Sequence, residues 1–298
     1  KMIITNKLNL PETFVNFVKQ DYEFKPNEYR VTSLLKGYKE MLLERRHRNE
    51  IEQDVSDMIW LLFGTAVHGV LEKSQESHNE FKEERLRVEF GKYVLSGQFD
   101  LYNAETKTLT DYKTASVWKI VYGDYTDWKM QLLMYAYMLK DAGFEVEKAQ
   151  IIAILKDHSK TKAKTDSTYP QLPVAVIPFK FTSQDFIDIQ TFIQNKFCQI
   201  ELLSELPDHA IPPCTAEERY NSGDKFAVMK KGRKTALRVV DTEAAAEQYI
   251  EWAVANKDLK EKDLDIEKRA GEDKKCKDYC SVCDFCNYYH NNVEEKQK

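Results

Sequence analysis

The chain has 298 residues, of which 42% are hydrophobic and 31% charged, and its net charge is −5. This length can bury a full core, either as one large domain or as a domain with an appendage. The composition is typical of a soluble globular protein, and without a run of about 18 apolar residues we expect no membrane span. The N-terminus lacks the apolar core and cleavage site of a signal peptide, which predicts a cytoplasmic location. The acidic balance does not by itself indicate nucleic-acid binding, although segregated charge or bound metal ions would offset it locally.

Two helices are expected in the first 50 residues. Residues 11–19 form a short helix, and residues 29–48 form a partly buried helix with Thr32 or Ser33 as its N-cap. The second helix ends in the basic run 45–48. This run is either a solvated terminus favoured by the helix dipole or a patch that contacts phosphate.

Residues 54–77 predict a long helix, and this helix is expected to be buried because positions 58–70 are almost wholly apolar. His68 is the one ionisable residue in that apolar centre. It is either a metal ligand or a hydrogen-bonded core histidine. Glu72 follows at i+4 on the same face, where it is either a second polar group in a cleft or a surface residue.

Three strands in an antiparallel meander follow this helix, at residues 84–90, 93–102 and 108–113. Asp100 lies near the end of the second strand. Because side chains alternate along a strand, Asp111 and Lys113 point to one face of the third strand and Tyr112 to the other. Burying two carboxylates and an ammonium is costly without a purpose. A hard divalent cation and a scissile phosphate would require such groups.

The next elements complete a sheet with helices around it. They are a helix at 127–139, a buried strand at 148–156, a flexible loop at 157–170, a strand at 173–180 and an amphipathic helix at 182–206. Gln131 and Tyr135 share one face of the helix at 127–139. Cys198, on the helix at 182–206, is expected to be a core residue. The order of elements predicts an α/β fold, a mixed β-sheet flanked by helices.

The composition changes from residue 211 onward. Residues 226–240 predict a β-hairpin that turns at 231–233, and a helix with Asp241 or Thr242 as its cap extends to residue 255. The five basic residues between 230 and 238 either track a phosphate backbone or form a solvated tip. We therefore divide the chain into an N-terminal helical segment at 1–50, a core at 51–206 and a cysteine-bearing C-terminal segment at 207–298.

The central carboxylates can be assigned a chemistry. Phosphodiester hydrolysis requires a hydroxide near neutral pH and neutralisation of charge at phosphorus, which carboxylate-bound Mg²⁺ or Mn²⁺ supplies. Asp100 and Asp111 would bind the metal with the Tyr112 carbonyl and His68, whose nitrogen favours Mn²⁺ somewhat. Lys113 would orient the water or stabilise the charge that develops.

The ordered motifs resemble the PD-(D/E)XK nuclease superfamily and, within it, the RecB-like exonuclease branch. They are Gly64-x-x-x-His68, Gly97-x-x-Asp100, Asp111-Tyr112-Lys113-Thr114 and Gln131-x-x-x-Tyr135. The branch includes CRISPR-associated adaptation nucleases and many phage-encoded exonucleases. The resemblance implies a restriction-endonuclease-like core in which His68, Asp100 and Asp111 bind metal and Lys113 is catalytic.

The same resemblance implies that Gln131 and Tyr135 position the DNA strand or the active-site lysine. One departure is the second acidic position, where Asp111 stands in place of the glutamate found in much of the superfamily.

The C-terminal cysteines Cys276, Cys280, Cys283 and Cys286 fall within eleven residues, a spacing that indicates a metal or iron–sulfur site. Cys214, which follows two prolines, is a fifth candidate. RecB-like nucleases often hold a 4Fe–4S cluster with one distant and three C-terminal cysteines. By resemblance the ligands here are Cys214, Cys276, Cys280 and Cys286, and Cys283 is spare.

The alternative C-terminal trio of ligands is Cys280, Cys283 and Cys286, and Zn²⁺ is the alternative metal. In the related nucleases the lone cysteine commonly precedes the core, whereas Cys214 follows it.

These features predict a Mg²⁺- or Mn²⁺-dependent deoxyribonuclease, most simply an exonuclease, that acts on DNA ends or single strands in a bacterial or phage-infected cell. Recombination or replication proteins are the expected partners, and the oligomeric state is open. Two alternatives are a non-catalytic DNA-end-binding accessory protein and a zinc-stabilised interaction protein whose acidic residues only form ion pairs.

Overall fold

The computed structural model describes residues 2–19, 25–75, 78–257 and 259–294. The chain separates into two compact units, residues 1–211 and 212–298. The three-part division expected from the sequence stays a prediction.

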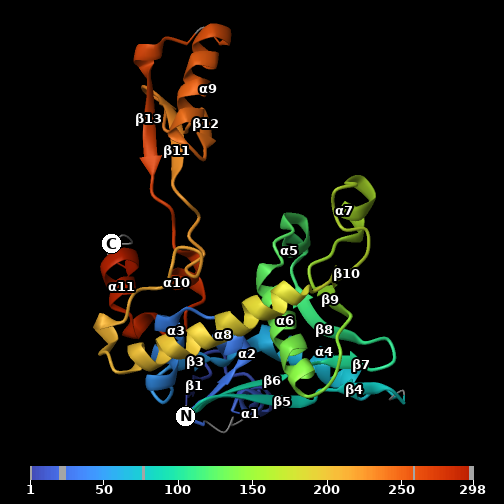
Figure 1. Ribbon diagram of the computed structural model, residues 1–298. Helices are drawn as coiled ribbons and strands as arrows, with labels where there is room; N and C mark the ends of the chain where they lie inside the picture. Colours follow the sequence, from blue (N-terminus) through green and yellow to red (C-terminus); the bar gives the residue numbers. More distant parts are fainter. Residues whose placement is uncertain (1, 20–24, 76–77, 258, 295–298) are drawn as a thin grey trace. The chain divides into compact units, whose positions relative to one another are not determined.

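Unit 1 alternates short helices with strands that form three sheets (Figure 1). Its elements are β1 (Ile3–Thr5), α1 (Glu12–Val18), β2 (Glu28–Arg30), α2 (Val31–Leu34), α3 (Tyr38–Arg46), β3 (Glu52–Asp54), η1 (Val55–Met58), α4 (Ile59–Glu72), β4 (Glu80–Lys82), β5 (Arg85–Phe90), β6 (Tyr93–Gln98), β7 (Leu101–Asn103), β8 (Thr108–Ala115), α5 (Val117–Tyr122), α6 (Thr126–Asp141), β9 (Lys148–Leu155), α7 (Lys160–Thr165), β10 (Val174–Phe179), α8 (Ser183–Ser204) and η2 (Asp208–Ala210).

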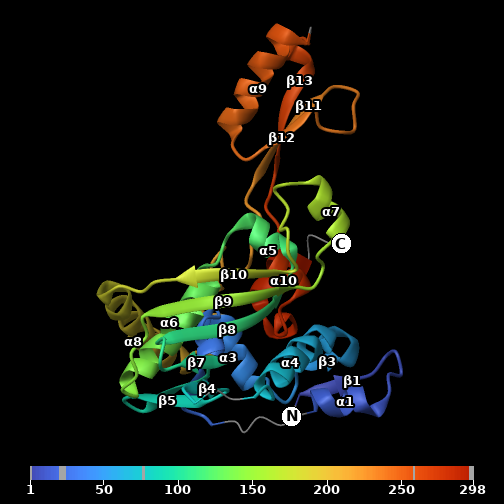
Figure 2. The same ribbon diagram turned by 90° about the vertical axis from the view of Figure 1, so that its right-hand side faces the viewer.

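The largest sheet has five strands in the order β10-β9-β8-β7-β4, seen side by side in Figure 2. Strands β8 and β9 are parallel, with Asp111 opposite Ile151, and the other neighbours are antiparallel. Helix α6 connects β8 to β9, as a parallel pair requires. The predicted mixed α/β fold is therefore confirmed.

Two helices lie on opposite faces of β8. Gln131 of α6 bonds to Asp111 and Lys113, which point to one face. On the other face, Gly64 of α4 lies against Thr114. The ring of His68 lies edge-on to the ring of Tyr112, with their centroids 6.2 Å apart. The alternation predicted for Asp111, Tyr112 and Lys113 is confirmed. Helix α8 packs along α6 and closes the core (Figure 1).

The strand expected at 93–102 is broken in the structure. β6 pairs with β5 and β2 in a three-stranded sheet, whereas β7 pairs with β8 and β4 in the five-stranded sheet. The chain changes sheets at Phe99 and Asp100. The prediction of one continuous meander is wrong here, because a single strand cannot serve both sheets.

The expectation that the apolar helix is buried is also wrong. None of the residues of α4 is buried, and Trp60 is 62% exposed. Glu72 is a surface residue. The predicted end of this helix at Ser77 lies outside the described residues.

By length and composition alone, Val55–Glu72 is long and apolar enough to cross a membrane. This stretch differs from the expectation that the chain contains no apolar run of membrane-spanning length. Helices of soluble proteins pass the same test, so composition does not decide what covers this one.

Smaller expectations also change. The predicted helix at 29–48 is β2 followed by α2 and α3, whose N-caps are Arg30 and Gly37 instead of Thr32 or Ser33. The loop expected at 157–170 contains the short helix α7. Cys198 is exposed and is not a core residue.

The basic run at the end of α3 is partly engaged with the protein itself. The guanidinium of Arg45 lies 3.9 Å from the ring centroid of Tyr29, and Arg46 pairs with Asp208 at 2.5 Å. These two cations therefore stabilise the fold of unit 1.

Unit 2 is a small α/β unit followed by a cysteine-bearing segment. Its elements are β11 (Lys225–Lys230), β12 (Arg238–Val240), α9 (Glu243–Asn256), η3 (Glu261–Asp263), β13 (Leu264–Arg269), α10 (Lys274–Asp278), η4 (Cys283–Phe285), α11 (Asn287–Tyr289) and η5 (His290–Glu294). The predicted hairpin is confirmed by the β11–β12 pairing, and Thr242 caps α9.

Candidate metal centre and active site

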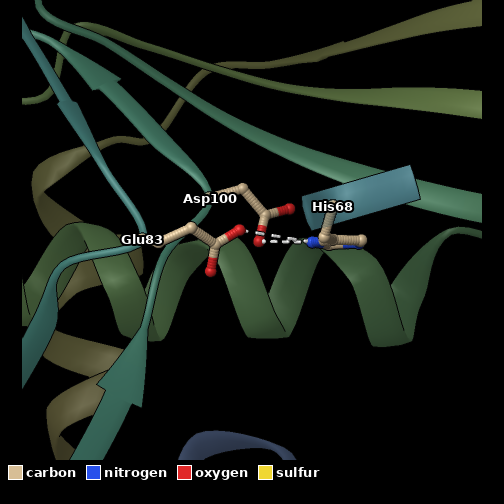
Figure 3. Close-up of side chains that lie close together, drawn as sticks. All are labelled: His68, Glu83 and Asp100. Carbon is tan, nitrogen blue, oxygen red and sulfur yellow. Dashed lines mark ion pairs between the residues drawn. The ribbon is translucent and has the colours of Figure 1, made fainter. Parts of the chain in front are cut away.

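Three side chains from separate segments converge beside β8. Nδ1 of His68 lies 3.2 Å from Oδ1 of Asp100 and 3.5 Å from Oε1 of Glu83 (Figure 3). The ligand atoms of all three lie within 4.8 Å of one another. His68 and Asp100 were expected at such a site. Glu83 was not, because the sequence places it only at the edge of a charged run.

The break between the two sheets creates this convergence. Asp100 lies where the chain leaves β6 and enters β7, and its carbonyl accepts a hydrogen bond from the Glu83 amide at 3.1 Å. Glu83 itself has φ of 51°, a left-handed conformation that is uncommon for a residue with a β-carbon. Unfavourable backbone conformations of this kind are often retained at functional sites.

His68 is held by its two acidic neighbours. Hydrogen bonds to Asp100 and Glu83 stabilise the charged imidazole and raise the pKa of His68 to about 10. The electrostatic potential at the His68 side chain is therefore strongly negative. A divalent cation at this position would satisfy the carboxylates in place of the imidazole proton.

A second cluster lies on the α6 face of β8. Nζ of Lys113 lies 2.7 Å from Oδ2 of Asp111 and 2.9 Å from Oε1 of Gln131. The Gln131 amide donates to Oδ1 of Asp111 at 3.3 Å and lies 3.2 Å from the hydroxyl of Tyr135. The structure thus brings together all four residues that the motifs placed here.

Asp111 is almost completely buried, with 2% of its surface exposed. Burial raises the pKa of Asp111 to about 6, against the opposing effect of Lys113, and the charge of Asp100 adds to the rise. Its Oδ2 atom has no aligned hydrogen-bond donor even though Lys113 is close. Asp111 is therefore a buried carboxyl group whose Oδ2 atom faces the Lys113 ammonium without an aligned hydrogen bond, and the charge of Asp100 makes a cation favourable at this site.

These residues fit a hard divalent metal. Carboxylate and imidazole atoms bind Mg²⁺ or Mn²⁺ at about 2.1 Å, so ligand atoms up to about 4.2 Å apart can share one ion. The three atoms near Asp100 need only small adjustments to meet that limit. The other oxygen of Asp100 accepts from the Tyr112 amide at 2.5 Å, which fixes the carboxylate. The expected role of the Tyr112 carbonyl stays a prediction.

Three cysteines of unit 2 affect one another electrostatically. Burial raises the pKa of Cys276 to about 11, with further contributions from Asp273, Cys214 and Cys286. The pKa of Cys283 is raised by burial and by Asp284, with no cysteine among the causes. Cys280 lies between Cys276 and Cys283 in the sequence, and its carbonyl accepts a hydrogen bond from the Cys283 amide at 3.4 Å.

Arg219 ties this segment together. Its side chain pairs with Asp273 at 3.1 Å, lies 4.4 Å from the ring centroid of Tyr288 and donates to the carbonyl of Cys214. Tyr288 donates in turn to Asp273 at 2.9 Å. These contacts hold Cys214 beside the cysteines that follow it by more than 60 residues.

Comparisons with solved structures give only distant likenesses. The protein SSO0001 is 16% identical with a TM-score of 0.44, over 63% of this chain and 83% of that one. An alkaline exonuclease from Laribacter hongkongensis is 10% identical with a TM-score of 0.37, over 60% and 90%. A phage-related exonuclease from Haemophilus somnus 129PT is 14% identical with a TM-score of 0.30, over 66% and 81%. No match was found among curated proteins.

The family comparison covers far more of the sequence. A sequence model of the PD-(D/E)XK nuclease superfamily matches residues 28–288, which include both acidic clusters and the C-terminal cysteines. This match confirms the superfamily that the ordered motifs predict, and the mixed sheet agrees with it. The chain therefore belongs to the PD-(D/E)XK nuclease superfamily.

Proposed function

We propose that the protein is a metal-dependent deoxyribonuclease of the RecB-like branch that acts as an exonuclease. The observation that carries this proposal is the pair of clusters around β8. The His68, Glu83 and Asp100 set offers a metal site, and it is joined to the strand that carries Asp111 and Lys113 by the bond from the Tyr112 amide to Asp100. Phosphodiester hydrolysis requires both a metal site and a cation near the phosphate.

In this proposal His68, Glu83, Asp100 and Asp111 hold Mg²⁺ or Mn²⁺. The bound ion supplies a nucleophile at neutral pH and offsets negative charge on the phosphate. Asp111 contributes the oxygen that has no aligned donor. Because Asp111 is buried, its negative charge is strongly felt at the site.

Lys113 has a separate task. Its ammonium is held between Asp111 and Gln131, so its direction is fixed before any substrate arrives. A cation fixed in this way orients a water molecule or stabilises the phosphorane charge without reorganisation. Gln131 and Tyr135 act through Lys113 and Asp111 and are positioning residues.

We further propose a 4Fe–4S cluster held by Cys214, Cys276, Cys280 and Cys286. The contacts of Arg219 with the Cys214 carbonyl, Asp273 and Tyr288 support this set over the C-terminal trio of Cys280, Cys283 and Cys286, because they link Cys214 to the segment that carries Cys276 and Cys286. The cluster would cross-link the two ends of unit 2. Zn²⁺ remains the alternative occupant.

The nuclease proposal is tested with linear and circular DNA in Mg²⁺ or Mn²⁺, using 5′- and 3′-labelled strands. We expect degradation of linear DNA only, with loss of at least 100-fold in rate for Asp111→Asn and Lys113→Ala. Lys148→Ala is the control, an exposed lysine at the opposite end of β9. DNA binding without cleavage by the wild type would instead indicate the accessory protein. Nicking of circles would exclude a strict exonuclease.

A further inference from the structure

Exposed aromatic side chains surround the end of β8 that lies beyond Lys113. Trp118 and Tyr122 of α5 stack with ring centroids 5.9 Å apart and an interplanar angle of 27°. Trp118 is 49% exposed and Tyr122 is 77% exposed. Large aromatic rings gain most when they are covered, so an open stack of this kind indicates a surface that receives another molecule.

The stack is held in place by the catalytic strand itself. Ser116 caps α5 and bonds to Asp157 at 2.6 Å, and the Val117 amide bonds to the same carboxylate at 2.7 Å. Strand β8 ends at Ala115, two residues beyond Lys113, which is about 7 Å along the strand. Helix α5, which carries Trp118 and Tyr122, therefore begins directly after the strand that holds Asp111 and Lys113.

A second tryptophan belongs to the same end of the sheet. Lys156 directly follows β9, its amide bonds to the carbonyl of Ala115, and its ammonium lies 3.9 Å from the ring centroid of Trp60. Trp60 lies eight residues before His68 on α4, about 12 Å along the helix. We name Trp60, Trp118 and Tyr122 the aromatic platform.

Lysines accompany the platform. Helix α7 carries Lys160, Lys162 and Lys164 in six residues without an acidic one, and Nζ of Lys162 lies 5.4 Å from the ring centroid of Trp118. Figures 1 and 2 both show α5 and α7 next to each other at this end of the sheet. Among the described residues, no carboxylate forms an ion pair with these three lysines or with Lys156, so their charge is available to a polyanion.

Rings with cations beside them are what a single strand of nucleic acid requires. Unpaired bases stack on aromatic rings whatever their sequence, and lysines attract the phosphates between them. A protein partner with an apolar surface would gain nothing from four lysines that have no carboxylate partner among the described residues. Paired bases in a duplex would not present their faces to the rings.

We infer that the aromatic platform binds unpaired bases of single-stranded DNA that leads to or from the active site. This inference rests on the proposed nuclease function and assigns it a substrate form, a strand that is single where it passes α5. Tyr122 and Trp118 receive the bases, and Lys156 and Lys162 contact the adjoining phosphates.

The test is binding of labelled single-stranded oligonucleotides in EDTA, which prevents cleavage, followed by fluorescence anisotropy. Each oligonucleotide is used in a normal form and in an abasic form with the same number of phosphates. The wild type should bind the normal form more tightly. Trp118→Leu and Tyr122→Leu should weaken binding of the normal form about 5- to 150-fold, the range expected for one lost stacking contact. They should leave binding of the abasic form unchanged.

Two matched variants separate stacking from bulk hydrophobicity. Trp118→Phe and Tyr122→Phe keep a ring and should restore most of the affinity, whereas leucine of similar hydrophobicity should not. Leu202→Ala removes an equally exposed apolar side chain from α8 and should bind like the wild type. Circular dichroism and thermal unfolding of each variant confirm that it is folded.

Three results would overturn the inference. These are equal binding by the leucine variants and the wild type, equal losses on normal and abasic strands, and a change of oligomeric state without a change in DNA binding. Cleavage by the wild type with Mn²⁺ is measured in parallel. A wild type that cleaves DNA while the leucine variants bind normally would reject the platform alone. A wild type that cleaves no DNA would reject the proposed function.

Discussion

The ammonium of Lys113 lies 2.9 Å from the side-chain oxygen of Gln131, and the nitrogen of the same amide faces Asp111 at 3.3 Å. The side-chain amide of Gln131 therefore fixes the positions of both the cationic Lys113 and the acidic Asp111. Because Gln131 is buried on α6, the geometry of β8 depends on a helix that follows it in the chain.

Gln131→Leu should lower kcat without weakening DNA binding. Leucine keeps the volume of the side chain but leaves Lys113 and Asp111 to pair only with each other, which displaces the ammonium. Misplacement of a catalytic group by about 1 Å costs on the order of 100-fold in rate. Single-turnover cleavage and binding in EDTA give the two quantities. An unchanged cleavage rate would show that Gln131 has no positioning role.

Glu83→Gln should raise the metal concentration needed for half-maximal cleavage, because the neutral amide is a weaker ligand. Loss of a group that supports a metal typically costs about 10- to 100-fold in affinity. Titration of activity with Mn²⁺ measures the change. Glu84→Gln is the matched control, since the neighbouring side chain is exposed and outside the cluster. The same metal requirement in both variants would remove Glu83 from the site.

Gly97→Ala should destabilise unit 1 by about 1–3 kcal/mol, the usual cost of overpacking. A β-carbon there would lie 2.6 Å from Cε1 of Tyr135 and 2.9 Å from Cγ2 of Val31, so buried neighbours must move. Because Tyr135 contacts Gln131, cleavage should fall as well. Urea unfolding measures the stability.

Gly64→Ala is the contrasting change. A β-carbon at Gly64 would meet Thr114 at 3.6 Å, an ordinary contact, and alanine favours a helix by about 0.5–1 kcal/mol. This variant should be as stable as the wild type or more so. If both variants were equally destabilised, the close packing of Tyr135 against β6 would not be the cause.

The pair of His47 and Asp208 should make stability depend on pH. Nε2 of His47 lies 2.7 Å from Oδ2 of Asp208. The pKa of His47 is raised by its hydrogen bonds to Asp208 and Glu50 despite partial burial, and the pKa of Asp208 is lowered by His47 and Arg46 despite partial burial.

A raised histidine pKa stabilises the fold below the unfolded value of about 6.5, and this is lost as pH rises through the folded pKa. A lowered carboxyl pKa stabilises the fold above about 3.9, and this is lost as pH falls through the folded pKa. Both contributions are present between about pH 4 and 6.5. His47→Gln should therefore cost about 1 kcal/mol at pH 5.5 and less at pH 9, measured by urea unfolding. An equal cost at both values would contradict this.

Cys276→Ser should abolish visible absorbance from a 4Fe–4S cluster in anaerobically purified protein and weaken unit 2. Cys283→Ser should retain both, because Cys283 is outside the proposed ligand set. Iron and sulfide analysis with the absorbance spectrum measures the outcome. A colourless wild type that contains one equivalent of zinc would replace the cluster with a Cys₄ zinc site.

The sequence predicts the elements that depend on local pattern. β8, β9, α6 and α8 lie within a few residues of their expected bounds because their apolar periodicity is long and regular. The grouping of Asp111 and Lys113 follows from alternation alone. These parts of the site needed no tertiary information.

Other features depend on what packs against the chain. Glu83 lies near Asp100 because Glu83 itself has a left-handed backbone conformation and because the chain changes sheets between β6 and β7. Neither feature has a signal in the local sequence. The apolar run of α4 predicts a covered helix, but it cannot say whether the cover is the fold itself or another molecule. Cys198 follows the buried Phe197 on amphipathic α8, and the sequence alone does not show that it lies outside the buried face.

The change of sheet at Phe99 and Asp100 has a thermodynamic consequence. A divalent ion bound by His68, Glu83 and Asp100 would join α4 to both sheets, so the folded state would bind it and the unfolded chain would not. By mass action, free metal at 100 times its dissociation constant would then add about 2.7 kcal/mol to the stability of unit 1. The thermal midpoint of this protein becomes a measure of its metal affinity, available even for variants that no longer cleave DNA.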